Sequence, residues 1–244
     1  MDNKKNALIT GANKGIGLET ARQLGQKNMT VLLGARDLKK AEKAAEELRK
    51  EGIDARPIEL DVNKAESIKR AAERVEHDFG RLDILINNAG VMKHQEGEKV
   101  SEQTMSAWRE TFETNVFGLI ETTQAFLPLL RKSEAGRIVN LSSILGSITL
   151  HATPGSPIYD NKSVSAYNVS KAAVNAYTVQ LAYELKDTGI KVNAAHPGWV
   201  KTDMGGEGAI MEIVDGVKTS VALATTGPDG PNGAFIHMGE TLPW

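Results

Sequence analysis

A tyrosine and a lysine four residues apart, Tyr167 and Lys171, form the pair of side chains in this sequence that is best suited to proton transfer. Residues four apart on a helix lie on the same face, about one turn apart. An unperturbed tyrosine has a pKa near ~10, which is too high for efficient proton transfer at neutral pH. A lysine cation within roughly 4–6 Å favours the phenolate and lowers this pKa by about 1–3. We therefore predict that Tyr167 exchanges a proton with a substrate and that Lys171 lowers its pKa.

Two adjacent serines, Ser142 and Ser143, follow the apolar run Arg137–Leu141, so both hydroxyl groups are expected at the carboxyl end of a strand. Successive side chains of a strand point to opposite sides, so we expect only one of them to face the site. The nearest histidine, His151, has no evident acid partner, and a hydrolase triad is not predicted. None of the five histidines has the spacing of metal ligands, so no metal site is predicted.

A glycine-rich segment follows the predicted strand Asn6–Thr10 and leads into a predicted helix. Glycines permit a tight turn and let the backbone approach a pyrophosphate, which the free N–H groups and the dipole of a helix N-terminus stabilise. The alternative is an ordinary glycine-rich turn. We predict a dinucleotide site, and the residues of this segment assigned to it are Gly11, Asn13, Lys14, Gly15, Ile16 and Gly17.

The end of the second predicted strand indicates which dinucleotide binds. In such folds an acidic residue at this point binds the ribose 2′-hydroxyl of NAD, whereas arginine accommodates the 2′-phosphate of NADP. Here the residue is Arg36, and Lys14 adds a second cation. Asp37 follows, and it is better explained as the N-cap of the next helix. A solvated surface charge is the alternative for Arg36, but we predict NADPH as the cofactor.

Short strand-like runs alternate with amphipathic helical stretches along the whole chain. The predicted strands are Asn6–Thr10, Thr30–Gly34, Ala55–Leu60, Leu82–Ile86, Arg137–Leu141, Lys191–Ala194 and Ala234–Ile236. The predicted helices are Gly15–Lys27, Leu38–Glu51, Lys64–Phe79, Met105–Arg131, Ala166–Lys186 and Ile210–Leu223. Continuous apolar strands are typical of a parallel sheet covered on both faces. The sequence therefore predicts an α/β fold with a Rossmann-type doubly wound parallel sheet, and residues 1–244 as a single domain.

The composition is typical of an enzyme of the cytoplasm. Lys and Arg number 29 against 31 Asp and Glu, a formal net charge of -2, so no field attracts nucleic acid or a membrane. Cysteines number 0, which excludes disulfides and thiolate catalysis. No apolar run approaches the roughly 20 residues that span a bilayer, and no signal peptide is expected. We predict a cytoplasmic protein with a small-molecule substrate.

Four motifs resemble those of the short-chain dehydrogenase/reductase family in type and order. They are Thr10–Gly17, Asn87–Gly90, Tyr167 with Lys171, and Pro197–Gly198. The segments Gly11–Gly17 and Pro197–Met204, with Gly230–Phe235 and Trp244, look most similar to the carbonyl reductase branch. The distance from Ser143 to Tyr167 is about twice that usual in the family, and insertions at this point also occur in that branch.

The resemblance assigns roles to further residues. It makes Ser143 the active hydroxyl and Asn115 the holder of a water that links Lys171 to solvent, although a capped bend of the helix also explains this asparagine. It makes Lys171 a contact of the nicotinamide ribose and Thr202 a contact of the carboxamide. The remaining residues that it places against the cofactor are Asp61, Val62, Asn88, Ala89, Gly90, Pro197, Gly198 and Val200. For Asp61 and Val62, a helix N-cap and simple packing are equal alternatives.

The predicted function is therefore that of an NADPH-dependent carbonyl reductase, in which Tyr167 is the general acid. The alternatives are a dehydrogenase or ketoreductase for a specific alcohol, steroid or acyl substrate, or a non-catalytic NADPH-binding redox sensor. Tyr159 is a second candidate acid, but no lysine follows it by four residues, and we expect it near the substrate mouth. The segment Thr149–Lys162 is expected to be a loop, and Met204–Gly208 either a lid or a disordered connection.

The resemblance also predicts a homodimer or homotetramer that associates through the helices Met105–Arg131 and Ala166–Lys186. The second helix is expected to offer the partner a face of small residues, which are Ala172, Ala173, Ala176 and Ala182. The insertion before Tyr167 could instead cover this face, in which case the protein would be a monomer.

Overall fold

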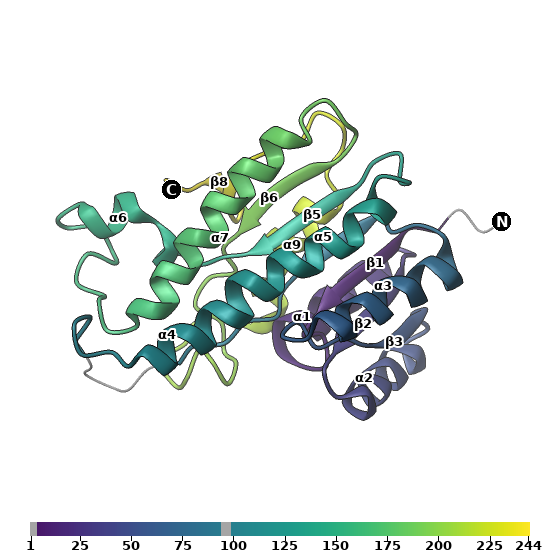
Figure 1. The fold of residues 1–244 in the computed structure, drawn as a ribbon, viewed down its shortest axis with the longest axis horizontal. Coiled ribbons are helices and arrows are strands. Elements are labelled where there is room, and N and C mark those ends of the chain that lie inside the picture. The colour runs from purple at the N-terminus through teal and green to yellow at the C-terminus, as the bar shows by residue number, and fades with distance from the viewer. Residues whose placement is uncertain (1–3, 94–98) are drawn as a thin grey trace.

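One eight-stranded sheet runs through the part of the chain that the computed structural model describes, residues 4–93 and 99–244 (Figure 1). The strands lie in the order β3-β2-β1-β4-β5-β6-β7-β8. Their bounds are β1 (Asn6–Thr10), β2 (Thr30–Ala35), β3 (Ala55–Glu59), β4 (Ile84–Asn87), β5 (Arg137–Leu141), β6 (Lys191–Ala195), β7 (Phe235–His237) and β8 (Glu240–Thr241). The first seven pair in parallel, so the predicted fold class is confirmed.

The seven predicted strands agree with the observed ones to within two residues at each end. The two-residue strand β8 was not predicted, and it pairs antiparallel with β7 across the turn at Met238 and Gly239. Both of these residues have positive φ, 48° and 89°. A strand this short has no periodicity in the sequence, and only its pairing with β7 defines it.

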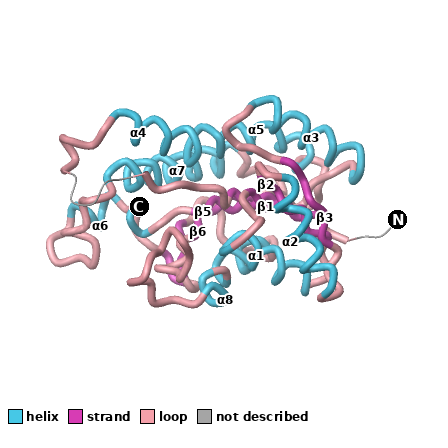
Figure 2. The backbone as a smooth tube through the Cα atoms, turned by 90° about the horizontal axis from the view of Figure 1, so that it is seen from below, coloured by secondary structure: helices cyan, strands magenta, loops and turns pink. Residues whose placement is uncertain are grey.

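Helices cover both faces of the sheet (Figure 2). On one face lie α3 (Ala65–Phe79), α4 (Met105–Phe112), α5 (Gly118–Leu130) and α7 (Ser165–Glu184), and on the other α1 (Gly15–Gln26), α2 (Leu38–Lys50), α8 (Ile213–Gly216) and α9 (Lys218–Ala224). Alternate side chains of β1 enter different cores, Ala7 and Ile9 with α1 and α2, and Leu8 with α3 and α5. This two-sided burial is why the strand sequences are apolar throughout.

The predicted helix Met105–Arg131 is interrupted at its middle, where a π-helical turn η1 (Glu113–Phe117) separates α4 from α5. The turn contains Asn115, whose side chain bonds to backbone outside the helix. A polar side chain that is drawn outward in this way favours a local widening of the helix. The prediction of one continuous helix was wrong at this point.

Two other predicted elements also differ from the structure. The expected loop Thr149–Lys162 begins with a short helix α6 (Ile148–Ala152), which Ser147 caps by accepting a hydrogen bond from the Leu150 amide at 3.2 Å. A 3₁₀ turn η2 (Ile144–Gly146) precedes it. The predicted helix Ile210–Leu223 is replaced by the shorter helices α8 and α9. No helix of the described residues combines the length and apolar composition needed to cross a bilayer.

Candidate active site

Ser143 and Tyr167 meet beyond the carboxyl end of β5. Ser143 is the second residue after that strand, and Tyr167 is in the first turn of α7. A side-chain hydrogen bond joins the two hydroxyl groups. Ser142 points away from Tyr167, as expected for the residue next to Ser143 in an extended strand. The Ser142 hydroxyl donates to Asn175 Oδ1 at 2.6 Å. Of the two serines, Ser143 is therefore the one placed against the tyrosine.

Lys171 lies beneath the tyrosine, one turn further along α7. Its Nζ is 5.5 Å from the centroid of the Tyr167 ring and donates to the carbonyl oxygen of Leu141 at 2.7 Å. The side chain is only 5% exposed. Burial without a carboxylate partner lowers the pKa of Lys171 to about 8. The lysine is therefore still mostly charged at neutral pH.

The pKa of Tyr167 differs from the prediction. Burial raises this pKa to about 12, and the hydrogen bond from Ser143 only partly opposes it. The expected lowering by Lys171 is absent because the ammonium group is directed to Leu141 and lies over the ring. The prediction of an acidified phenol was wrong for this arrangement. Tyr167 keeps its proton throughout the neutral range, which suits a group that donates one.

Asn115 ties α7 to the end of β4. Its Oδ1 accepts from the Val91 amide at 2.8 Å, and its Nδ2 donates to the Val91 carbonyl at 2.9 Å and to Ser170 Oγ at 3.0 Å. Ser170 in turn donates to the Tyr167 carbonyl at 2.7 Å. Through its bond to Ser170, Asn115 thus contacts α7, the helix of Tyr167 and Lys171. Ser170 is a residue that sequence reasoning missed. Its position directly before Lys171 was the available signal.

Another contact that the sequence did not reveal supports the first turn of α7. Gln103 is buried, and its Oε1 accepts from the Ala166 amide at 2.8 Å. This bond replaces the missing side-chain cap at Val164. Since 63 residues separate the partners, no local pattern indicates the contact.

The glycine-rich segment forms the turn between β1 and α1. Gly11 and Gly15 have positive φ, and a Cβ on Gly17 would lie 2.6 Å from the Gly11 carbonyl oxygen. Asn88 holds the turn by donating to the carbonyl oxygens of Thr10 at 2.7 Å and Gly11 at 3.2 Å. The N-terminus of α1 has no side-chain cap, so its first amides can receive an anion. The residues present therefore fit a dinucleotide pyrophosphate.

The floor beside this turn is built of small residues. The Ala89 amide donates to Thr10 Oγ1 at 2.9 Å, which fixes the backbone after β4 against β1. A Cβ on Gly90 would lie 3.3 Å from Asn115 Oδ1 and 3.8 Å from Lys171 Nζ. The glycine thus permits a close approach between this backbone and the catalytic helix.

The residues predicted beside the adenosine half lie at the ends of β2 and β3. Arg36 is exposed, and within the described residues its guanidinium has no ion pair or hydrogen bond. Asp37 is the N-cap of α2, as predicted, and accepts from the Lys40 amide at 3.3 Å. The alternative of Asp61 as an N-cap was wrong, since α3 begins after Lys64. Val62 is buried in the core, so packing accounts for it at least in part.

Lys14 and Asp203 connect the glycine turn to the segment after β6. Their side chains form an ion pair with 2.5 Å between Lys14 Nζ and Asp203 Oδ2. The turn at Gly198 is held by its amide, which donates to His196 Nδ1 at 3.3 Å. Thr202 accepts a hydrogen bond from the Gly205 amide at 3.2 Å.

The segment expected to be a lid or a disordered connection is folded as a closed loop. The closed loop consists of residues 200–211, and a bridge between Val200 and Met211 joins its two ends. The Trp199 Nε1 donates to the Gly205 carbonyl at 2.8 Å, and a Cβ on Gly208 would lie 2.8 Å from the indole ring. The tryptophan is nevertheless 56% exposed. The loop therefore presents an aromatic surface near the predicted nicotinamide contact.

The insertion before Tyr167 is held in place by its own contacts. Lys162 Nζ lies 3.0 Å from the His151 carbonyl oxygen and 5.2 Å from the centroid of the Tyr159 ring. The C-terminal residue joins this region, because the Thr149 amide donates to the Trp244 carbonyl at 2.9 Å. Tyr159 is 37% exposed, and the lysine over its ring, Lys162, is itself exposed, whereas Lys171 under Tyr167 is buried. Among the described residues, no group of three or more His, Asp or Glu side chains is placed to hold a metal ion.

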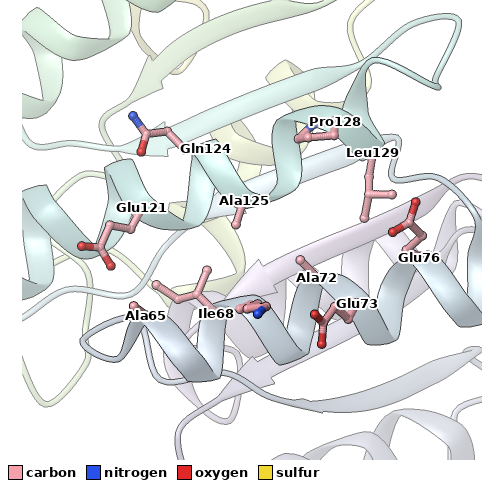
Figure 3. Close-up of a pocket in the computed structure, with 11 residues that line it drawn as sticks. Ala65, Ile68, Ala72, Glu73, Glu76, Glu121, Gln124, Ala125, Pro128 and Leu129 are labelled. Carbon is pink, nitrogen blue, oxygen red and sulfur yellow. The ribbon is translucent and has the colours of Figure 1, made fainter.

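A separate groove of about 530 Å³ lies between α3 and α5 (Figure 3). Its apolar lining comes from Ala65, Ile68, Ala72, Ala125, Pro128 and Leu129. Glu73, Glu76 and Glu121 also line it, and Glu76 is paired with Lys132 at 2.8 Å. None of the predicted site residues lines this groove. Its volume alone does not make it the candidate site, since the polar groups converge at the ends of the strands instead.

Comparison with known proteins agrees with this geometry. A sequence model of the family described as short chain dehydrogenase matches residues 5–210. The chain is 40% identical over 244 residues to short-chain dehydrogenase anuI of Penicillium roqueforti, covering 96% of this chain and 94% of the relative. It is 32% identical to carbonyl reductase (NADPH) 1 of Mus musculus, covering 98% of each. The structure of NADPH-bound carbonyl reductase from chicken fatty liver superimposes with a TM-score of 0.86 at 30% identity, covering 99% of both chains.

Proposed function

The chain belongs to the short-chain dehydrogenase/reductase family of oxidoreductases, which use nicotinamide cofactors, and on this premise we propose that it is an NADPH-dependent carbonyl reductase. Its substrate is a ketone or an aldehyde. The observation that carries the proposal is the hydrogen-bonded pair Ser143 and Tyr167 above a buried Lys171, beside an uncapped helix N-terminus suited to a dinucleotide. The cofactor, when bound, supplies the hydride.

Tyr167 is the general acid of the proposed reaction. Reduction of a carbonyl places negative charge on its oxygen, and the tyrosine hydroxyl donates a proton to that oxygen. A pKa raised to about 12 keeps this proton in place until the strongly basic alkoxide forms. Ser143 provides a second hydroxyl, which orients the carbonyl and stabilises the developing charge. The reverse reaction would require the phenolate, which burial disfavours at neutral pH.

Lys171 and Asn115 support the acid from below. The lysine cation lies one turn below the tyrosine, and its position suits the hydroxyls of the nicotinamide ribose. Asn115 bonds to Val91 and Ser170, which fixes α7 relative to the cofactor floor. We propose that it also orders a water beside Lys171, as the family resemblance implies.

NADPH is the proposed cofactor because two cations lie where its 2′-phosphate is expected. Arg36 is exposed at the end of β2, and Lys14 belongs to the glycine turn. A planar guanidinium suits both a phosphate and an adenine ring. The two carbonyl reductases to which the chain is similar are described as an NADPH enzyme and as NADPH-bound. The remaining proposed cofactor contacts are the residues named above from the glycine turn, the strand ends and the segment Pro197–Thr202.

The surface around the site favours an apolar substrate. Three large apolar side chains near it are exposed, namely Ile148 at 69%, Trp199 at 56% and Met204 at 40%. They belong to α6 and to the segment after β6, outside the strands of the sheet. We therefore propose a ketone or aldehyde that has a hydrophobic body.

The test is the loss of NADPH absorbance with a panel of aldehydes, ketones and diketones of increasing apolar size. Parallel reactions with NADH measure the cofactor preference. We expect turnover with NADPH, and kcat/KM that increases with the apolar size of the substrate. Binding of NADPH without turnover of any carbonyl would instead favour the redox-sensor alternative, and equal kcat/KM with both cofactors would contradict the proposed preference.

A further inference from the structure

The ion pair between Lys14 and Asp203 joins two segments that are distant in the sequence. Lys14 directly precedes the first residue of α1, and Asp203 follows the predicted carboxamide contact Thr202. The neighbouring residues Gly15 and Thr202 also lie close together, since a Cβ on Gly15 would lie 3.6 Å from Thr202 Cγ2. The pair therefore spans the two sides of the proposed cofactor site.

The two partners depend on each other for their electrostatic interactions. Within the described residues, neither side chain makes another ion pair or hydrogen bond. The hydrogen bond and the charge of Lys14 lower the pKa of Asp203, so this carboxylate is ionised at neutral pH. The side chains are 69% and 83% exposed, so the Lys14 ammonium group can also reach a bound anion with little cost of desolvation.

One ammonium group thus faces two possible anions. The 2′-phosphate of NADPH needs cations, and the two proposed for it are the exposed Arg36 at the end of β2 and Lys14 on the glycine turn. Asp203 already occupies the Lys14 ammonium in the structure. A carboxylate and a phosphate that share one lysine also repel each other. NADH has no 2′-phosphate, so this competition does not affect its binding.

We propose that Asp203 sets the degree of cofactor discrimination, because it competes with the 2′-phosphate of NADPH for Lys14. This inference rests on the proposed use of NADPH and deepens it. Asp203 contacts no reacting atom and acts through Lys14, so it is a positioning residue. Removing its charge frees the lysine, and the preference for NADPH over NADH increases.

The experiment is a double-mutant cycle on cofactor affinity. The dissociation constants of NADPH and NADH are measured by fluorescence titration at low salt for the wild type, Asp203→Asn, Lys14→Ala and the double variant. We expect Asp203→Asn to improve the ratio of the two dissociation constants in favour of NADPH by roughly two- to fivefold, the range of one exposed ion pair. In the Lys14→Ala background this gain disappears.

Glu212→Gln is the matched control. It removes one carboxylate at the end of the same closed loop, but Glu212 pairs with Lys201 rather than with the glycine turn. The ratio of dissociation constants should therefore equal that of the wild type. Because all of these side chains are exposed, the variants are expected to fold, and their melting temperatures check this.

Three results would overturn the inference. Equal weakening of both cofactors by Asp203→Asn would mean that the pair acts as a clasp over the part that they share. An unchanged ratio would mean that Lys14 does not choose between the two anions. If Asp203→Asn still improves the ratio in the Lys14→Ala background, Asp203 repels the 2′-phosphate directly and does not act through Lys14. A wild-type ratio near one contradicts the proposed NADPH preference instead, since the inference depends only on how the ratio changes.

Discussion

Burial determines the protonation of the two titrating side chains in the proposed active site. It raises the pKa of Tyr167 to about 12 and lowers that of Lys171 to about 8. In both cases the charged form is the one disfavoured by loss of water. At neutral pH the neutral tyrosine and the charged lysine coexist, an arrangement suited to donating a proton.

Removal of the tyrosine hydroxyl tests the assigned acid. We expect Tyr167→Phe to reduce kcat at least about 100-fold, the usual contribution of a general acid. The dissociation constant of NADPH should change little, since only the proton donor is lost. Tyr159→Phe, which removes the rival hydroxyl, should keep its activity. If Tyr167→Phe keeps more than about a tenth of the wild-type kcat, the acid has been assigned to the wrong residue.

The rate of reduction should fall as the pH rises through about 8. Lys171 loses its charge there, and its proposed contact with the hydroxyls of the nicotinamide ribose is then weakened. Tyr167 does not titrate in this range, because its pKa is about 12. A profile of kcat against pH measures the effect, and a rate that stays constant to about pH 10 would contradict the role of the lysine.

The free energy of unfolding should increase with pH in the range where the rate of reduction decreases. Folded Lys171 titrates at about 8, below the ordinary value of 10.5, so the unfolded chain binds more protons between these values. The free energy of unfolding of the wild type should therefore increase, relative to Lys171→Met, as the pH rises through this window. Denaturant titrations at several pH values give the comparison.

At the level of elements, the π-helical turn η1 brings the active site and the cofactor floor together. It contains Asn115, and it ends next to Gly118, the first residue of α5. Gly118 is buried against the loop between β3 and α3, and a Cβ on it would lie 2.5 Å from the Val62 carbonyl oxygen. The helix can approach this loop closely only because residue 118 has no side chain.

Gly118→Ala should therefore disturb both the packing and the site. The added methyl group would force α5 away from Val62, so we expect the free energy of unfolding to fall by about 1–3 kcal/mol. NADPH should also bind more weakly, because Val62 is a proposed adenine contact. Gly227→Ala is the control, since a Cβ at that position meets nothing within 4 Å. Equal melting temperatures for the two variants would show that the close approach is not required.

For the whole molecule, the exposed side of α7 is apolar along most of its length. Val169, Val179 and Tyr183 are 46%, 37% and 68% exposed, and Ala176 is exposed between them. Ala182, however, is buried in the core, so its assignment to the partner face was wrong. Figure 1 shows α6 to one side of α7, and the exposure of Val179 and Tyr183 means that the insertion does not cover them.

This surface favours a homodimer or homotetramer built on α7. Light scattering during size-exclusion chromatography should give a mass of at least about twice 26.3 kDa. Val179→Glu should shift the mass to that of the monomer, because it buries an unpaired charge in the interface. Val214→Glu introduces the same charge at an exposed valine of α8 and should not change the mass. A wild-type mass near 26.3 kDa would mean that the protein is a monomer.

Local patterns in the sequence were enough to predict the strands of the sheet and the cap of one helix. The apolar run of β1 indicates burial on both faces, and Asp37 has the position of an N-cap that the structure confirms. Strand alternation predicted that only one of Ser142 and Ser143 faces the site, and Ser142 is directed away from Tyr167. These features depend on neighbours within a few positions along the chain, so spacing is sufficient to predict them.

Features that depend on distant neighbours were decided only by the tertiary structure. Gln103 supports the helix of Tyr167 across 63 residues, and Lys14 meets Asp203 across 189. The pKa of Tyr167 rises although a lysine lies one turn away, because burial and the direction of the ammonium group outweigh the spacing. Desolvation and hydrogen-bond direction are properties of the packed environment, and residue order along the chain does not contain them.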